Sequence, residues 1–187
     1  MLSDSEMQRR GTLQVEVGDR GVKAWRRTKN ISVGPGGVTA DYVPFYFAPR
    51  SPMLFKISRG GVEQYPEGRQ DPLVHLVTAV DVVEGLGVPF VFSDGNCAKS
   101  ITEVFDDLSH LDKVDWPLMK ERYWNDTASD GDRMRRRMAE FLVYDRVPWS
   151  AFLGVGTMTE EVAARMRNIL ASFGLRVDVK VMRDWYY

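Results

Sequence analysis

The sequence is poor in the residues that build disulfide bonds and metal sites. It contains one cysteine, Cys97, and two histidines, His75 and His110, among 187 residues. A single cysteine excludes an internal disulfide bond and is typical of proteins of the reducing cytoplasm. One thiol and two imidazoles are too few for the usual zinc sites. We therefore expect a cytoplasmic protein that needs no metal ion.

Long hydrophobic runs and a strong net charge are also absent from the sequence. No apolar run approaches the ~20 residues of a membrane-spanning helix, and the N-terminus lacks a signal-peptide pattern. The 25 Lys and Arg residues nearly balance the 26 Asp and Glu residues, which gives a formal net charge of −1. The composition therefore argues against a membrane protein and against a general binder of polyanions.

The basic residues are nevertheless clustered. The clusters are Arg9-Arg10, residues 23–29 and Arg133–Arg137. A cluster of this kind can form a local phosphate-binding surface. Taken singly, each of them is more often an ordinary solvated surface.

Hydrophobic periodicity predicts an α+β fold. The 187 residues, 44% of them hydrophobic, suffice for one domain with its own core. Strands are predicted at residues 54–58, 73–77, 89–92, 138–144, 152–155 and 176–182, and helices at residues 3–10, 20–28, 78–86, 100–109 and 116–124. A last helix is predicted to begin at a capping box of Thr157 and Glu160 and to end at Gly174. Because strands and helices do not alternate regularly, we expect a split, mainly antiparallel sheet with flanking helices.

An aromatic, proline-rich segment spans residues 41–54 and contains Pro44, Pro49 and Pro52. Aromatic side chains favour extended structure, whereas proline donates no hydrogen bond to a sheet. We therefore expect this segment at the edge of a sheet or as an irregular wall. The preceding Gly34–Gly37 segment, Gly-Pro-Gly-Gly, predicts a loop.

The sequence is centred on residues 138–144, Met-Ala-Glu-Phe-Leu-Val-Tyr, which predict a strand. Alternation places Phe141 and Val143 on one face and Glu140 on the other. A glutamate at the head of an apolar strand is costly to bury unless its charge has a partner or a function, and by itself it is more often exposed. We interpret Arg133–Arg137 as a mobile basic loop beside it, an arrangement that suits chemistry on an anionic substrate.

Four blocks of the sequence carry a resemblance to a known family. They are Tyr42–Leu54, Pro89–Asp94, Ala139–Tyr144 and Asp184–Tyr187. Together they resemble the DarT family of DNA ADP-ribosyltransferase toxins, and the resemblance runs from about residue 3 to residue 187. It implies one DarT-like ADP-ribosyltransferase domain over residues 1–187. It also implies that NAD+ supplies ADP-ribose, that thymidine bases in single-stranded DNA accept it, and that a DarG macrodomain antitoxin reverses the modification.

The resemblance assigns catalytic roles to Glu140 and to one arginine of the pair Arg26-Arg27. Glu140 occupies the glutamate of the family's Ala-Glu-Phe-Leu-Val block, and counting back from the Pro35–Gly37 loop favours Arg26. A carboxylate that faces the ribose stabilises the oxocarbenium-like transition state of ADP-ribose transfer. A guanidinium can stabilise the thymine anion that forms when the ring nitrogen loses its proton, and we assign this role to Arg26.

Tyr46, Arg50 and Met53 resemble the wall of the family's NAD+ pocket. Arg50 is a candidate for binding the pyrophosphate, although a structural ion pair with a neighbouring acid is an equally good interpretation. Tyr46 and Phe45 point to opposite faces, so only one of them lines the pocket. Met53 is a candidate contact of the nicotinamide, but methionine is more often a packing residue.

The candidates for binding a single nucleic-acid strand are Tyr123, Trp124, Arg135 and Arg136. Aromatic rings stack on bases and arginines contact phosphates, which is the usual way of holding single strands. These residues fall within residues 106–139, where the acceptor-binding loop is expected. An aromatic pair in a helical pattern is, however, more often part of a core.

One departure from the family pattern concerns the start of the chain. Family members usually begin with a strand and a helix that carry a His-x-Thr-like motif and an asparagine, which help to hold NAD+. No histidine precedes His75 here, so we expect a chain that is short at its N-terminus and that binds NAD+ weakly. Two alternatives remain open: the same fold with an RNA or protein acceptor, and a non-catalytic remnant that binds nucleic acid or DarG.

Overall fold

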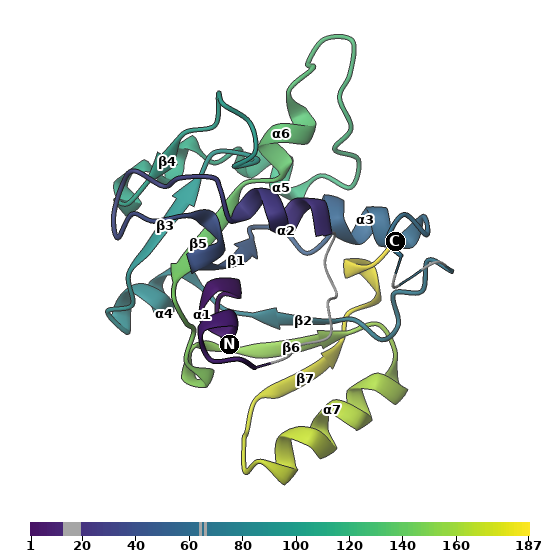
Figure 1. The fold of residues 1–187 in the computed structure, drawn as a ribbon. Helices are drawn as coiled ribbons and strands as arrows, with labels where there is room; N and C mark the ends of the chain where they lie inside the picture. Colours follow the sequence, from purple (N-terminus) through teal and green to yellow (C-terminus); the bar gives the residue numbers. More distant parts are fainter. Residues whose placement is uncertain (13–19, 64, 66) are drawn as a thin grey trace. The chain divides into compact units, whose positions relative to one another are not determined.

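The computed structural model describes residues 1–12, 20–63, 65 and 67–187 (Figure 1). These residues form two compact units, each of which contains its own sheet. The first unit comprises Met1–Pro52 and Val88–Val147, and the second comprises Met53–Gly87 and Pro148–Tyr187. Within the described residues no helix is both long and apolar enough to cross a membrane.

The first unit is built on a four-stranded antiparallel sheet with the strand order β1-β5-β3-β4. The strands are β1 (Tyr42–Tyr46), β3 (Phe90–Ser93), β4 (Val104–Phe105) and β5 (Glu140–Tyr144). The predicted strand at 138–144 is confirmed as β5, an inner strand whose first four residues are buried. The proline-rich segment is confirmed at an edge of the sheet, where it forms β1. Pro44 lies opposite Leu142. Proline lacks a backbone N–H, and an edge strand tolerates this because it has only one neighbouring strand.

Short helices accompany this sheet. They are α1 (Asp4–Arg9), α2 (Arg20–Arg26), α5 (Trp116–Lys120) and α6 (Arg133–Arg137), with 3-10 turns at Thr39–Asp41 and Leu108–Lys113. The predicted N-terminal helix is confirmed, because the Ser3 hydroxyl accepts the Glu6 backbone N–H at 3.2 Å and so caps α1. A buried cluster of Ile31, Tyr42, Val91, Cys97 and Leu142 fills the space beside the sheet.

The second unit contains a three-stranded sheet with the strand order β2-β6-β7. Its elements are α3 (Pro52–Ser58), β2 (Val74–Val77), α4 (Val80–Gly85), β6 (Gly154–Thr157), α7 (Glu160–Ser172) and β7 (Asp178–Val181), with 3-10 turns at Trp149–Ala151 and Arg183–Trp185. Strands β2 and β6 are antiparallel, whereas β6 and β7 are parallel. The two sheets confirm the predicted split, mainly antiparallel α+β architecture.

Two predicted elements are wrong. Residues 54–58 belong to helix α3 and not to a strand. Proline is accepted in the first turn of a helix, and the buried Leu54 and Ile57 have the helical spacing of three residues. Residues 100–109 do not form a helix; they contain β4 and the start of a 3-10 turn. Glu103 and Asp94 exchange hydrogen bonds there, which extends the pairing of β4 with β3.

Further details differ from the predictions. The helix predicted at 116–124 ends at Lys120. Thr157 lies in β6, and Thr159 caps α7 instead by accepting the Val162 N–H at 3.3 Å. The segment Arg133–Arg137, interpreted as a mobile basic loop, is the short helix α6.

Candidate active site

Glu140 at the head of β5 is buried against Arg26 at the end of α2. One guanidinium nitrogen of Arg26, Nη1, donates to both carboxylate oxygens, at 3.2 and 3.1 Å. The exposed fractions of the two side chains are 14% for Arg26 and 10% for Glu140. A buried carboxylate is strongly unfavourable without a partner, and Arg26 supplies that partner from a position 114 residues away in the sequence.

A second set of hydrogen bonds fixes Arg26 from the side of Thr39. Arg26 Nη2 donates to the Thr39 carbonyl at 3.3 Å, and the Thr39 hydroxyl donates to the Arg26 carbonyl at 2.8 Å. Thr39 is fully buried. Arg27 takes a different direction, since its Nε donates to Asp4 of α1 at 3.0 Å. The structure thus brings Arg26, and not Arg27, to Glu140.

Tyr46 faces the same side of the sheet as Glu140. The two residues lie directly opposite each other in the pairing of β1 with β5, whereas Phe45 lies opposite Phe141. Directly opposed residues of an antiparallel pair place their side chains on one face. Tyr46, and not Phe45, therefore shares the surroundings of Glu140.

Arg26, Tyr46 and Cys97 surround Glu140 and form with it the Glu140 group. Burial and the charge of Glu140 shift the pKa values of these three residues. Burial opposes the charged form of Arg26, but the Glu140 carboxylate outweighs this effect and raises the pKa of Arg26 above its ordinary value. Burial, together with the charge of Glu140, also raises the pKa of the Tyr46 phenol. Burial raises the pKa of the Cys97 thiol to about 12. At neutral pH the group therefore holds a guanidinium cation beside a neutral phenol and a neutral thiol.

Two residues beside Glu140, Ser93 and Cys97, were not singled out from the sequence. The Glu140 backbone N–H donates to the Ser93 hydroxyl at 3.1 Å, and that hydroxyl donates to the Gly95 carbonyl at 2.7 Å. The Cys97 thiol interacts with the side chains of both Ser93 and Glu140. The available sequence signal was the turn Asp94–Asn96, which follows a strand end where ligand-binding loops often lie.

Arg50 and Met53 are placed differently from Tyr46. Arg50 follows β1 in the first unit and is partly buried; its carbonyl accepts a hydrogen bond from Arg137 at 3.2 Å. Met53 lies in the first turn of α3, is half exposed, and is grouped with the second unit. Of the three proposed NAD+ contacts, Tyr46 and Arg50 therefore share a unit with Glu140.

The two aromatic candidates for DNA binding differ in their exposure. The Tyr123 side chain is 76% exposed, whereas Trp124 is only 4% exposed. A buried indole offers no face on which a base can stack, so the structure contradicts the expectation for Trp124 and supports its interpretation as a core residue. Neighbouring residues of an extended segment alternate in this way, and the predicted helix would have hidden the alternation.

Arg135 and Arg136 are engaged in ion pairs inside the first unit. Arg135 binds Asp132 at 2.8 Å and Asp94 at 2.9 Å, and its side chain is only 10% exposed. Arg136 pairs with Asp115 and Asp130. The expectation of a mobile basic run is therefore wrong, because the nearby Asp130 and Asp132 and the more distant Asp94 and Asp115 pair with these arginines. The same pairs lower the pKa of Asp130 and of Asp132.

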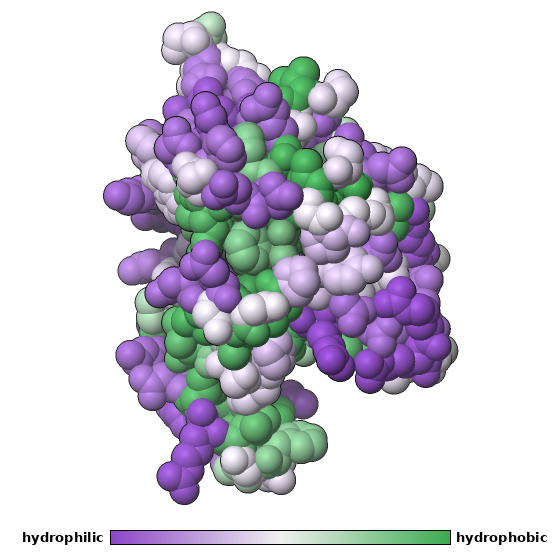
Figure 2. Space-filling view, turned by 90° about the vertical axis from the view of Figure 1, so that its left-hand side faces the viewer, coloured by the Kyte–Doolittle hydropathy of each residue, from purple (hydrophilic) through white to green (hydrophobic). Residues whose placement is uncertain are grey.

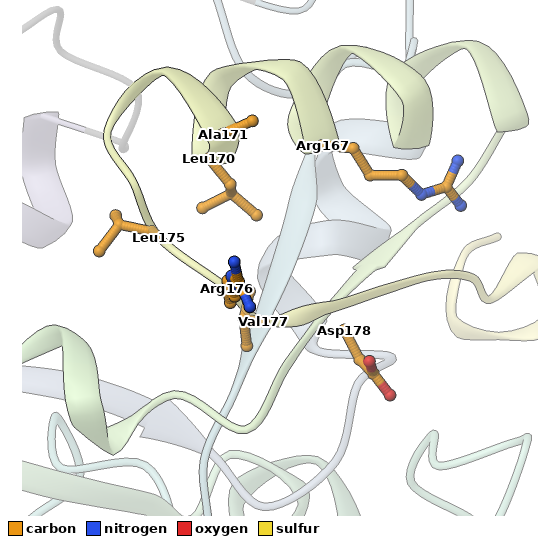
Figure 3. A pocket seen from close by; sticks show the side chains of 7 residues that line it. All are labelled: Arg167, Leu170, Ala171, Leu175, Arg176, Val177 and Asp178. Atoms are coloured by element: carbon orange, nitrogen blue, oxygen red, sulfur yellow. The ribbon is translucent and has the colours of Figure 1, made fainter.

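The second unit contains a cavity of about 390 Å³ between α7 and the segment that leads to β7 (Figure 3). Leu170 points from α7 toward Arg176 and Val177 in that segment. Arg167, on the rim, is already bound to Glu160 and to the Val179 carbonyl. The lining contains no residue of the Glu140 group. Among the described residues no group of three or more His, Cys, Asp or Glu side chains is placed to hold a metal ion.

The fold and the site together define a class of enzyme. A fixed carboxylate at a strand head, paired with a guanidinium and flanked by a tyrosine, suits stabilisation of an oxocarbenium-like transition state. Such an arrangement suits the chemistry of an ADP-ribosyltransferase.

Comparisons with known proteins give the particular family. The profile of the family described as "ssDNA thymidine ADP-ribosyltransferase, DarT" matches residues 1–187. A relative from Thermus sp. (strain 2.9), named "DNA ADP-ribosyl transferase", is 37% identical over 164 residues, which cover 87% of this chain and 76% of the relative. The chain belongs to the DarT family.

Two solved structures agree with this assignment. "Thermus sp. 2.9 DarT in complex with ADP-ribosylated ssDNA" matches with a TM-score of 0.91 and 33% identity, over 100% of this chain and 87% of that chain. "Thermus sp. 2.9 DarT in complex with NAD+" matches with a TM-score of 0.84, also at 33% identity and over the same shares of both chains. The chain is thus a DNA ADP-ribosyltransferase by its family, and the α+β fold expected from the resemblance is confirmed.

Proposed function

We propose that Glu140 and Arg26 are the catalytic pair with which this chain transfers ADP-ribose from NAD+ to a thymidine base in single-stranded DNA. The observation that carries the proposal is the buried contact of Arg26 Nη1 with both oxygens of Glu140. A carboxylate and a guanidinium that are fixed before the substrate arrives need little rearrangement during the reaction, which is the condition for electrostatic catalysis.

Glu140 acts on the ribose. Its carboxylate accepts a hydrogen bond from the ribose 2′-hydroxyl and faces the positive charge that develops at the anomeric carbon. The bond between ribose and nicotinamide breaks, and its electron pair leaves with the nicotinamide. The thymine ring nitrogen forms the new bond at the anomeric carbon, and its proton passes to water.

Arg26 acts on the acceptor base. It remains protonated, because Glu140 holds its pKa above the ordinary value. It can therefore stabilise the negative charge that develops on the thymine ring as the ring nitrogen loses its proton. The hydrogen bonds to Thr39 keep the guanidinium in place while this charge forms.

The remaining contacts are proposed for the two substrates. Tyr46, a neutral phenol beside Glu140, donates a hydrogen bond to NAD+. Arg50 binds the pyrophosphate, and Met53 contacts the nicotinamide. Tyr123 stacks on a base of the DNA strand. Arg135 and Arg136 shape the DNA-binding loop, since both are bound to acidic residues.

The biological setting is also part of the proposal. We infer that residues 1–187 act as one DarT-like domain, that the protein is a toxin, and that a DarG-like macrodomain antitoxin is its partner. The resemblance to the family supports these assignments. A cytoplasmic location follows from the substrates, since NAD+ and single-stranded DNA meet in that compartment.

The substitution Glu140→Gln tests the catalytic assignment, because it keeps the shape of the side chain and removes its charge. We expect labelling of a thymidine-containing oligonucleotide by NAD+ to fall about 10²–10³-fold or more. The matched control is Glu160→Gln on α7, where the carboxylate is exposed and paired with Arg167; it should label at the normal rate. Near-normal labelling by Glu140→Gln would refute the role of Glu140. An RNA oligonucleotide of the same sequence and a protein acceptor, assayed in parallel, test the two other acceptors.

A further inference from the structure

One arginine of α6 holds the loop between α5 and α6 at three points. Arg133 donates through Nη2 to the Tyr123 carbonyl at 3.0 Å and to Glu121 Oε2 at 2.7 Å. Through Nε it donates to the Asn125 carbonyl at 3.1 Å. Its side chain is 18% exposed. The three acceptors belong to alternate residues, as expected when one edge of an extended segment faces the guanidinium.

This arrangement determines where the Tyr123 ring lies. Arg133 binds the Tyr123 backbone, and the neighbouring Trp124 is buried. Tyr123 itself is left largely exposed. A large exposed aromatic ring on a fixed backbone is typical of a binding surface, because it offers a flat apolar face at low conformational cost.

The rest of the loop is tied to the same helix. Asp126 accepts the Met134 backbone N–H at 2.8 Å, and Asp130 pairs with Arg136. Figure 2 shows hydrophilic side chains gathered at the upper end of the molecule, at the height where Figure 1 draws the loop before α6. The loop is polar, and its acidic residues Glu121 and Asp130 are paired with arginines of α6. Tyr123 is the large aromatic residue that the loop exposes.

The loop also shares a support with Glu140. The Arg135 carbonyl in α6 accepts the Asn96 N–H at 2.9 Å. The turn that contains Asn96 begins at Ser93, whose hydroxyl accepts the Glu140 N–H. The position of α6, and with it the loop, is therefore fixed relative to the catalytic glutamate through one turn.

We propose that Arg133 is a positioning residue that holds Tyr123 as a stacking platform for a base of the acceptor strand. This inference rests on the proposed function, since it assumes that single-stranded DNA is the acceptor. A lysine cannot replace Arg133, because an ammonium on a flexible stem lacks the planar fork that reaches two carbonyls and a carboxylate together.

The test is a double-mutant cycle on the KM for a thymidine-containing oligonucleotide. Loss of one base–aromatic stack in Tyr123→Ala should raise this KM about 5- to 100-fold, while Tyr123→Trp should restore it. Arg133→Gln and Arg133→Lys should raise it several-fold, with the KM for NAD+ unchanged. Combined with Tyr123→Ala, Arg133→Gln should add almost nothing, because both changes remove the same platform.

The outcomes separate the inference from the proposed function. Arg167→Gln, which also breaks one ion pair and one bond to a carbonyl, is the control and should leave both KM values as they are. Fully additive effects of Arg133→Gln and Tyr123→Ala would show that Arg133 does not act through Tyr123. An unchanged KM in Tyr123→Ala would show that Tyr123 does not stack on the DNA. Either result overturns the inference, while the proposed transfer to DNA stands. Failure of the unsubstituted protein to label DNA would overturn the proposed function and the inference with it.

Thermal unfolding of each variant, followed by circular dichroism, identifies any variant whose KM changes through loss of the fold.

Discussion

The pairing of Arg26 with Glu140 shows what a single buried contact contributes. Glu140 is enclosed by Arg26, Tyr46, Ser93 and Cys97, and Arg26 is its charged partner in this group. The family resemblance led to Glu140 because it lies in a recognisable sequence block, and to Arg26 because of its distance from the Pro35–Gly37 loop. Thr39 supports Arg26 through one hydroxyl and one carbonyl, and no sequence pattern distinguishes such a threonine from any other.

Alanine substitutions at Arg26 and Arg27 test this contact at the level of single residues. Arg26→Ala leaves a buried carboxylate without a partner, so we expect the free energy of unfolding to fall by about 3 kcal/mol and DNA labelling to fall at least about 10²-fold. Arg27→Ala removes a more exposed pair with Asp4, which is worth about 0–1 kcal/mol, and should label normally. Urea unfolding and oligonucleotide labelling measure both effects. An inactive Arg27→Ala beside an active Arg26→Ala would transfer the role to Arg27.

At the scale of elements, the best-predicted segments were those with a strong local pattern. The apolar alternation of β5 and the prolines of β1 reflect local rules, and both predictions are confirmed. Helix α3 was missed because its short apolar run fits either period until tertiary packing selects one. Three of the partners of α6, Asp94, Asp115 and Glu121, were missed because they lie outside the segment that leads into it. Asp130 and Asp132 are close in sequence, but their pairing depends on the turn before α6. Composition identifies a basic run but does not identify its partners.

The turn between β3 and Cys97 gives a prediction at this scale. A Cβ atom on Gly95 would lie 2.9 Å from the Arg135 carbonyl oxygen and 2.5 Å from Arg135 Nη1. Gly95→Ala should therefore push the turn away from α6, lower the free energy of unfolding by about 1–3 kcal/mol, and reduce kcat through the Ser93 contact to Glu140. Denaturant unfolding and steady-state labelling measure the two effects.

Gly85→Ala is the control for this turn, since a Cβ atom there meets nothing within 4 Å. If Gly95→Ala matches the wild type in both stability and kcat, α6 and the turn are not tightly packed against each other, and the proposed link between the loop and Glu140 fails.

The whole molecule buries several weak acids in their neutral forms. Burial raises the pKa of Cys97, Tyr42 and Tyr186 to about 12, from ordinary values of 9.0 for the thiol and 10.0 for the phenols. In the pH range between the ordinary and the raised values, the unfolded chain releases protons that the folded chain keeps. The unfolded state then binds fewer protons, so stability falls as pH rises.

We therefore predict that the midpoint of thermal unfolding stays level from pH 7 to about 9 and falls steadily from there toward about 12. Scanning calorimetry between pH 7 and 11 measures this dependence. Cys97→Ala removes the group that titrates first and should make the fall begin nearer pH 10.0, the ordinary pKa of the phenols. A midpoint that is constant up to pH 11 would show that these groups ionise in the folded protein as they do in water.

The distance along the chain between Arg26 and Glu140 has a consequence for biosynthesis. Strand β1 has β5 as its neighbour in the sheet, so it gains its partner only after residues 140–144 have left the ribosome. Contacts of such long sequence separation form late, because the intervening chain must first be ordered. A nascent chain that stops before β5 has neither the acid nor the strand that carries it. The growing polypeptide therefore remains without the pair of Arg26 and Glu140 until β5 has been synthesised and has left the ribosome.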